Sequence, residues 1–389
     1  MKTFLKHTFS AAALLLTSLQ AQAQLDKIPE PPSIDAKSYA LIDFASGELL
    51  ASKDPDARIE PASITKVMTT YVAFDEIKRG RLHYDDEALV SEKAWKQGID
   101  SSESRMFLDV GSRVKIIDLL RGIIIASGND ASIALAEHIA GSESAFAELM
   151  NQYAAKLGLK NTHFVDASGL PDPEHYTTAR DLAMLGRALI RDFPQDYKIY
   201  SEKSFKYKIA RPQENRNGLL IKDPSVDGIK TGHTSSAGYC LLSSSQRNGR
   251  RLISAVMGSK TWAYREQASL ELLNYGFRFY EMVPLLGPSA PVATIPAYKG
   301  EQDTVQVGTL QPVSLSLPRG AKDRVKMEPK ITQQAIAPIA PGQVVGTIAI
   351  TLDGKLIRNE PLVALTAVAE GGLFTRAVDT VRLWWAGGQ

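Results

Sequence analysis

Three short segments of this chain carry side chains that together could activate a serine for acylation without a histidine. They are residues 63–66 (SITK), 127–129 (SGN) and 230–232 (KTG). In order, they supply a serine with a lysine three residues later, a second serine with an asparagine, and a second lysine. A Ser-x-x-Lys pair alone should arise by chance about once in a chain of this length. The ordered set of three therefore carries the interpretation, which is a serine nucleophile activated by a lysine.

Ser63 is the predicted nucleophile and Lys66 its predicted base. Residues three apart share one face of a helix, so the two side chains can meet. A lysine accepts a proton only when it is neutral, and both burial and a neighbouring positive charge favour the neutral form. Lys230 could supply that charge. We also expect the backbone N–H of Ser63, at the start of a helix, to stabilise an oxyanion.

A second Ser-x-x-Lys sequence occurs at residues 112–115 (SRVK). It directly follows Gly111 and precedes an apolar helical pattern, so Ser112 has the position of a cap or turn residue. It also lies too close in sequence to Ser127 to leave room for a helical layer between them. We therefore expect Ser63, and not Ser112, to be the nucleophile.

The middle segment lies between two helical patterns, which predicts a loop that points Ser127 and Asn129 into a cleft. Ser127 could pass a proton between Lys66 and a leaving amine, and Asn129 could hold Lys66 and the substrate amide in place. The alternative interpretation is an ordinary Ser-Gly-Asn turn with no chemical role.

The third segment leads into a predicted strand, which we expect at a sheet edge beside the nucleophile. An edge strand can pair with an extended peptide and aim the backbone N–H of His233 at an oxyanion. Gly232 would remove a side chain where the substrate approaches. Lys230 and Thr231 would bind a carboxylate. The alternative is a charged surface turn.

These segments and their neighbours resemble those of the low-molecular-weight penicillin-binding proteins. The matching stretches are residues 61–66 (PASITK), 125–131 (IASGNDA) and 226–234 (VDGIKTGHT). Within that group, nearly the whole chain resembles the D-alanyl-D-alanine carboxypeptidases of the Gram-negative envelope. The resemblance implies an α/β (α+β) catalytic domain like that of the serine β-lactamases, with an antiparallel five-stranded sheet, helices on both sides, and a smaller all-β domain after it.

The resemblance also implies an activity, which is removal of the terminal D-alanine from peptidoglycan stem pentapeptides without a cofactor. β-Lactam antibiotics would acylate and inhibit the same serine. The nucleophile, the general base and the proton-relay and orienting groups would be Ser63, Lys66, Ser127, Asn129 and Lys230. Two arginines, Arg216 and Arg265, would bear on the terminal carboxylate region of the substrate.

Other enzymes remain as alternatives, first among them a β-lactamase or a peptidoglycan endopeptidase on the same scaffold. Class A β-lactamases deacylate with a Glu-x-x-Leu-Asn element between the second and third segments, where this chain has none. Residues 271–274 (ELLN) are similar but lie after Lys230. A Ser-His-Asp hydrolase is disfavoured because no Gly-x-Ser-x-Gly sequence occurs. A non-enzymatic cell-wall-binding module would leave Ser63 unreactive toward penicillins.

The composition excludes several further classes. The 389 residues include 45 Lys and Arg and 43 Asp and Glu, a net charge of +2, so no nucleic-acid binder is indicated. The six histidines are scattered, with no HExxH motif or cysteine cluster, so we expect no metal. Cys240, the one cysteine, lies in an apolar run and is predicted to be a buried strand thiol.

The two ends of the chain indicate where it works. Lys2 and Lys6, the apolar residues 11–16 and the sequence AQA at 21–23 are typical of a secretory signal, so we predict a signal peptide over 1–23. At the other end, one face of a predicted helix from Leu373 to Trp385 gathers apolar residues, including two tryptophans. We expect residues 372–389 to attach the protein to the surface of the inner membrane from the periplasm.

Between these ends we predict a catalytic domain over 24–281 and an all-β domain over 282–371. In the first we expect two strands within 38–52, a helix over 63–79, a helix over 114–125 and a hairpin over 238–258. Prolines at 284, 288, 291 and 296 indicate a linker. Beyond it, alternating apolar residues and Asp353-Gly354 predict strands and a hairpin.

Overall fold

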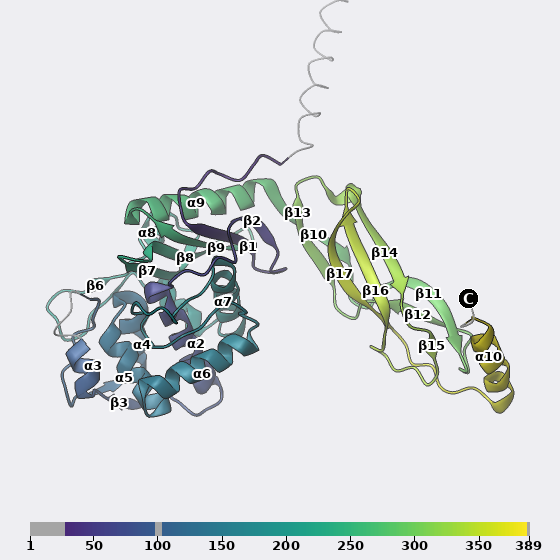
Figure 1. The fold of residues 1–389 in the computed structure, drawn as a ribbon, viewed down its shortest axis with the longest axis horizontal. Coiled ribbons are helices and arrows are strands. Elements are labelled where there is room, and N and C mark those ends of the chain that lie inside the picture. Colours follow the sequence, from purple (N-terminus) through teal and green to yellow (C-terminus); the bar gives the residue numbers. More distant parts are fainter. Residues whose placement is uncertain (1–27, 98–102, 387–389) are drawn as a thin grey trace, which may run out of the picture. The chain divides into compact units, whose positions relative to one another are not determined.

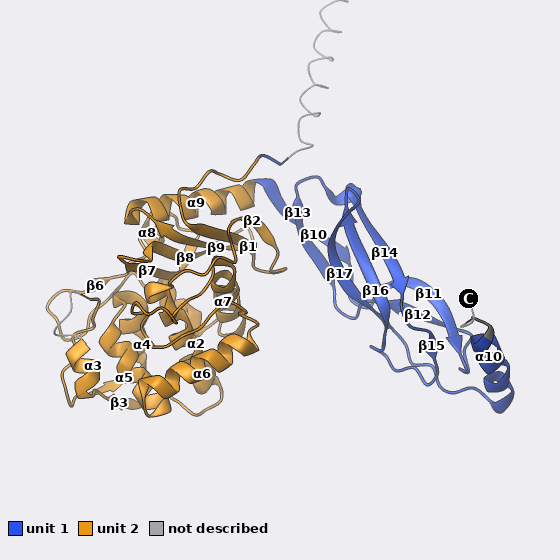
Figure 2. Ribbon diagram, viewed as in Figure 1, with its two compact units in different colours: residues 1–29, 279–389 blue, residues 30–278 orange. Residues whose placement is uncertain are grey.

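The computed structural model describes residues 28–97 and 103–386. The predicted signal peptide lies outside the described residues. The chain divides into two compact units, one over residues 30–278 and one that contains residues 279–389 (Figure 2). Each unit has a hydrophobic core of its own.

The strands and helices of the first of these units follow in chain order. They are β1 (Ser38–Asp43), β2 (Leu49–Lys53), η1 (Ala62–Thr65), α2 (Lys66–Lys78), β3 (Glu87–Leu89), α3 (Glu92–Gln97), β4 (Arg113–Lys115), α4 (Ile116–Arg121), η2 (Gly122–Ala126), α5 (Asn129–Ala140), α6 (Glu143–Lys156), α7 (Ala179–Asp192), η3 (Asp196–Ser201), β5 (Ser204–Phe205), β6 (Gln213–Glu214), α8 (Leu219–Lys222), β7 (Val226–Thr234), β8 (Gly238–Arg247), β9 (Arg250–Ser259) and α9 (Trp262–Phe279).

A five-stranded antiparallel sheet in the order β2-β1-β9-β8-β7 forms the middle of this unit (Figure 1). Alternate residues of each strand point to opposite faces. On one face, Leu41 and Leu252 pack against Gly276 of α9. On the other face, Ile229 and Leu242 pack against Gly186 of α7. Helices therefore cover both faces, and the predicted fold is confirmed.

The predicted hairpins form because their turn residues accept left-handed backbone angles. Asn248 and Gly249, between β8 and β9, have φ of 49° and 77°. Two consecutive positive φ values define the tight turn whose twist matches that of paired strands. The hairpin brings β8 back antiparallel to β9 and leaves β7, with the KTG segment, at the edge of the sheet.

One predicted helix begins later than its apolar pattern indicates. Val114 lies in β4 and pairs with Ala88 of β3, and the helix starts at Ile116. The spacing of apolar residues fits a helix, but Val114 is buried as the central residue of a three-residue strand. The helix then changes to a π-helical turn, η2, which ends directly before Ser127.

The second unit is built from strands and one terminal helix. Its elements are β10 (Tyr280–Leu286), β11 (Pro291–Tyr298), β12 (Thr304–Gly308), β13 (Val313–Pro318), η4 (Lys322–Arg324), β14 (Val325–Ile331), β15 (Ala335–Ile336), β16 (Val344–Leu352), β17 (Lys355–Ala364) and α10 (Leu373–Ala386). Six strands form a sheet in the order β14-β16-β17-β12-β11-β15, and β10 pairs with β13. The predicted all-β character is confirmed.

The predicted proline linker is wrong. Pro284 lies within β10 opposite Ser314, and Pro296 lies within β11 opposite Thr304. Proline lacks an N–H, but it is tolerated in strands where that group would not face a partner. Of the four prolines, only Pro288 lies between strands, in the turn that joins β10 to β11.

Candidate active site

The nucleophile segment sits where a short 3-10 turn becomes a long helix. Ser63 lies in η1, and Lys66 is the first residue of α2. Ala62, directly before Ser63, has a left-handed φ of 49°, a strained angle for a residue other than glycine. Lys66 Nζ lies 3.0 Å from Ser63 Oγ. The structure thus brings together the two side chains that the sequence pairs.

Lys66 is buried among polar partners. Its side chain is 0 % exposed, and its Nζ donates to Asn129 Oδ1 and to the backbone oxygen of Ser168, both at 2.7 Å. Burial lowers the pKa of Lys66 to about 7, although the carboxylates of Asp166, Glu103 and Asp130 act in the opposite direction. An amine with this pKa is partly neutral at physiological pH and can accept a proton.

The three neighbours of the Lys66 amine suit a base. A neutral amine has two N–H bonds and one lone pair. The oxygens of Asn129 and Ser168 can accept the two N–H groups, because a carbonyl oxygen only accepts. The lone pair then remains for the hydroxyl proton of Ser63.

Ser127 faces the second lysine. It follows the π-helical turn with a left-handed φ of 61°, and its Oγ accepts from Lys230 Nζ at 3.0 Å. Burial, together with the nearby charges of Lys66, Arg216 and Arg265, holds the pKa of Lys230 well below its ordinary value. The charge of Lys66 thus lowers the pKa of Lys230, whereas the pKa of Lys66 is lowered by burial and by Arg216, and not by Lys230 as predicted.

The edge strand β7 passes close to the nucleophile turn. A Cβ on Gly232 would lie 2.9 Å from the backbone oxygen of Pro61 and 3.1 Å from the Cβ of Ala62. Gly232 is therefore needed for the contact of β7 with η1, a reason different from the expected clearance for substrate. The ring of His233 stacks on Tyr239 with 4.1 Å between ring centroids.

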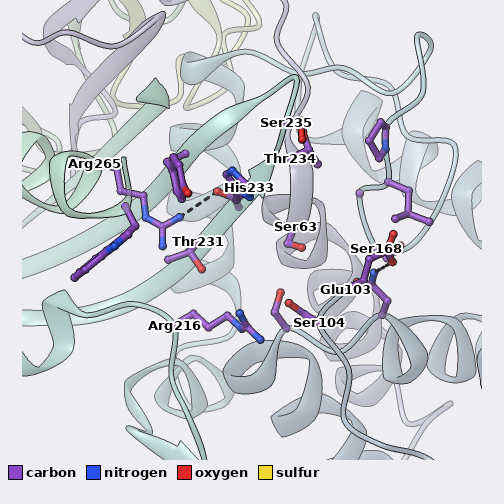
Figure 3. A pocket seen from close by; sticks show the side chains of 18 of the residues that line it. Ser63, Glu103, Ser104, Ser168, Arg216, Thr231, His233, Thr234, Ser235 and Arg265 are labelled. Carbon is purple, nitrogen blue, oxygen red and sulfur yellow. Dashed lines mark hydrogen bonds between the residues drawn. The ribbon is translucent and has the colours of Figure 1, made fainter. Parts of the chain in front are cut away.

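A pocket of about 780 Å³ is lined by Ser63, Ser127, Asn129 and Gly232, whereas Lys66 and Lys230 are buried and are not among its lining residues. Figure 3 shows Ser63 with Arg216 and Arg265 on one side and Glu103 and Ser168 on the other. Arg265 is 7 % exposed and donates to the backbone oxygen of Gly232 at 3.1 Å. Arg216 donates to the backbone oxygen of Ala126 at 3.2 Å. Thr231 and His233 also line the pocket.

Two segments were weighed in the sequence for a similar role, residues 112–115 (SRVK) and 271–274 (ELLN), and neither contributes to this pocket. Ser112 donates from Oγ to the backbone oxygen of Asp109 at 2.6 Å, as a turn residue does. Asn274, in α9, accepts from Arg247 at 2.8 Å. Among the described residues, those that line the pocket include neither of them.

Three residues of the site were not found from the sequence. Ser168 contributes a backbone oxygen, which no side-chain motif reveals. Asp166 holds that loop, since its carboxylate accepts from the backbone N–H groups of Ser168 and Gly169, each at 2.6 Å. This Asp-x-Ser-Gly sequence is typical of a side-chain-supported turn and could have been noticed. Glu103 accepts from Asn129 Nδ2 at 2.5 Å, and nothing local indicates it.

Comparisons with known proteins agree with the fold and indicate the family. Residues 25–261 match the D-alanyl-D-alanine carboxypeptidase family, and residues 280–370 match the C-terminal domain of penicillin-binding protein 5. The chain is 45 % identical over 360 residues to D-alanyl-D-alanine carboxypeptidase DacA of Escherichia coli K12, covering 92 % of this chain and 89 % of that protein.

Comparison with solved structures finds proteins of the same kind. Penicillin-binding protein 5 from Haemophilus influenzae is similar with a TM-score of 0.83 and 42 % identity, over 88 % of this chain and all of that one. The Streptomyces K15 DD-transpeptidase has a TM-score of 0.60 and 28 % identity, over 64 % of this chain and 99 % of that one. With a matching family model over most of its length and these relatives, the chain belongs to the D-alanyl-D-alanine carboxypeptidase family of serine peptidases.

Proposed function

We propose that this enzyme removes the terminal D-alanine from peptidoglycan stem pentapeptides through an ester on Ser63. The observation that carries the proposal is the buried amine of Lys66, whose pKa is about 7 and whose Nζ lies 3.0 Å from Ser63 Oγ. That geometry supports a serine activated by a lysine, and the family supports a D-Ala-D-Ala bond as the target.

In the first step, Lys66 takes the hydroxyl proton of Ser63 while Oγ attacks the carbonyl carbon of the penultimate D-alanine. The negative charge that develops on the carbonyl oxygen would be stabilised by the backbone N–H groups of Ser63 and His233. Ser127, beside Lys230, would give its hydroxyl proton to the leaving nitrogen as the C–N bond breaks and take the proton held by Lys66 in its place, which leaves Lys66 neutral again. D-Alanine leaves with a neutral amine, and the rest of the peptide stays on Ser63.

Recognition of the substrate end would fall to the cationic side of the pocket. Arg216 and Arg265 would attract the terminal carboxylate, and Thr231 would donate a hydrogen bond to it. In the second step, water attacks the ester and releases the shortened peptide. The proton from water returns to Ser63.

A penicillin presents a carboxylate and a strained amide with the same spacing, so it would acylate Ser63 in the same way. The lactamase alternative is not favoured, because the ELLN sequence lies in α9 and its Asn274 is bonded to Arg247.

Release of D-alanine from a pentapeptide ending in D-Ala-D-Ala tests the activity. The wild type should release it and Ser63→Ala should not, whereas Ser112→Ala should behave as wild type. A folded wild-type protein that releases no D-alanine contradicts the proposal.

We further infer that the protein works in the periplasm, attached to the inner membrane by α10. Asp379 of α10 is buried and accepts from the backbone N–H of Lys299 at 2.6 Å. Leu373, Phe374 and Trp384 are each more than three-quarters exposed, at 85 %, 83 % and 78 %. A helix that docks through a carboxylate and exposes its apolar side is suited to a membrane interface. Within residues 28–97 and 103–386, no helix has the length and apolar character needed to cross a bilayer.

A further inference from the structure

We propose that Glu103 is a positioning residue for acylation, whose carboxylate fixes the orientation of the Asn129 amide and so keeps the lone pair of Lys66 directed at Ser63. This inference rests on the function proposed above, since it concerns the same acylation step. Glu103 lies outside all three motifs and makes its contribution through Asn129.

A short chain of hydrogen bonds connects Glu103 to the base. Glu103 Oε2 accepts from Asn129 Nδ2 at 2.5 Å, and Asn129 Oδ1 accepts from Lys66 Nζ at 2.7 Å. An ionised carboxylate can only accept hydrogen bonds. The NH₂ end of the Asn129 amide must therefore face Glu103, and its oxygen must face Lys66.

Backbone contacts on the C-terminal side of Glu103 hold it in place. The N–H of Asn129 donates to the backbone oxygen of Ser104 at 2.9 Å. Two residues further on, the carboxylate of Asp130 accepts from the N–H of Met106 at 2.8 Å. Gln97 Nε2 also donates to Glu103 Oε2 at 2.9 Å. The first turn of α5 thus fixes both the amide and the segment that orients it.

The orientation of the amide matters because a neutral amine has one lone pair. With the oxygen of Asn129 and the backbone oxygen of Ser168 accepting its two N–H groups, Lys66 offers the lone pair to Ser63. If the amide turned over, its NH₂ group would face Lys66 and compete with the Ser63 hydroxyl for that lone pair. The base would then be occupied for part of the time.

The charge of Glu103 gives the proposal a second readout. The titratable and charged groups around Lys66 are Glu103, Asp130 of α5, Asp166 of the 166–170 loop, His175, Arg216, and Lys230 of β7. The three carboxylates raise the pKa of Lys66 against the effect of burial, and Arg216 lowers it. Removing one carboxylate should therefore lower that pKa, so that Lys66 stays neutral to a lower pH.

Glu103→Gln tests the proposal because Gln keeps the shape but can donate as well as accept. The acylation rate of the full chain with a fluorescent penicillin is measured from pH 5 to 9. We expect the plateau rate to fall about tenfold, a part of what a general base contributes. We also expect the acidic limb of the profile to move to lower pH. Glu103→Asp, which keeps the charge, should keep the wild-type limb.

Asp109→Asn is the matched control. Asp109 lies on the same segment with an exposed carboxylate that pairs with Lys208. This variant should keep both the plateau and the limb. Circular dichroism at each pH checks that every variant is folded, and Glu103→Ala replaces Glu103→Gln if the latter is not.

Two results overturn the proposal. One is a Glu103→Gln variant with the wild-type plateau and limb. The other is a Glu103→Gln variant that is acylated at the wild-type rate but loses the ester slowly, which would assign Glu103 to the activation of water. Absence of acylation in the wild type would contradict the proposed function, and it is recognised separately because the wild type is measured first.

Discussion

At the residue scale, the proposed chemistry depends on how easily Lys66 loses its proton. Its pKa of about 7 results from burial, against the effect of three carboxylates. A lysine with its ordinary pKa would be almost wholly charged at neutral pH and could not accept the Ser63 proton. Burial lowers the pKa of Lys66, and the hydrogen bonds to Asn129 and Ser168 direct its lone pair at Ser63.

This pKa predicts a pH profile. Because the neutral amine is the active form, the acylation rate should rise with pH through an apparent pKa near 7 and level off above it. Lys66→Arg should lower the plateau by about 10² to 10⁴, since a guanidinium stays protonated. Acylation by a fluorescent penicillin across pH 5 to 9 measures both the wild-type pH profile and the plateau rate of Lys66→Arg. A profile that is still rising at pH 9 would show that Lys66 keeps its ordinary pKa.

The residues found from the sequence and those missed differ in a physical way. Ser63 and Lys66 were predictable because their spacing of three residues puts them on one helical face. The Ser168 oxygen belongs to the backbone and reaches Lys66 across 102 residues. Glu103 reaches Asn129 across 26 residues, from a segment without a local signature. Contacts of these two kinds depend on the folded chain and leave no periodic or motif signal.

At the element scale, the position of Ser63 depends on how closely β7 approaches η1. Gly232→Ala would place a methyl group 2.9 Å from the backbone oxygen of Pro61, which cannot move without moving the turn. Small displacements of a nucleophile are costly in rate. We therefore expect acylation to fall about tenfold or more, measured with the same penicillin.

Gly186→Ala is the matched control for that variant. Its Cβ would also meet a neighbour at 2.9 Å, but the neighbour is the end of the flexible Ile229 side chain on the sheet face covered by α7. It should lower the melting temperature while leaving acylation near the wild-type rate. Equal losses of acylation in the two variants would reject the positional argument.

Some strands and helices could be predicted from the sequence, and others could not. The β8–β9 hairpin was predicted because Asn248-Gly249 determines its turn from two residues. The helix over 114–125 was predicted to begin too early, since Val114 pairs with Ala88, 26 residues away in sequence. Pro284 and Pro296 indicated a linker but lie in strands, because pairing geometry decides whether a proline is tolerated.

At the scale of the whole molecule, we expect the exposed apolar side chains of α10 to bind membranes. Replacing Phe374 and Trp384 together by Ser should cut binding to anionic phospholipid vesicles by more than tenfold, because burial of each large apolar side chain is worth about 1.5–3 kcal/mol. Cosedimentation with the vesicles measures the bound fraction. D-Alanine release from a small soluble peptide should not change.

Two exposed apolar residues elsewhere in the same unit provide the control. Ile331 and Leu356 are 46 % and 52 % exposed, and replacing both by Ser should leave vesicle binding unchanged. If the two double variants lose binding equally, α10 has no special part in attachment.

The proposed function requires the Ser63 hydroxyl to form the covalent bond. The most direct measurement is mass spectrometry of the intact protein after penicillin treatment, followed by peptide mapping of the adduct. We predict a single adduct on Ser63, absent from Ser63→Ala and unaffected in Ser112→Ala. An adduct on any other residue, or one that persists in a folded Ser63→Ala protein, would show that Ser63 is not the nucleophile.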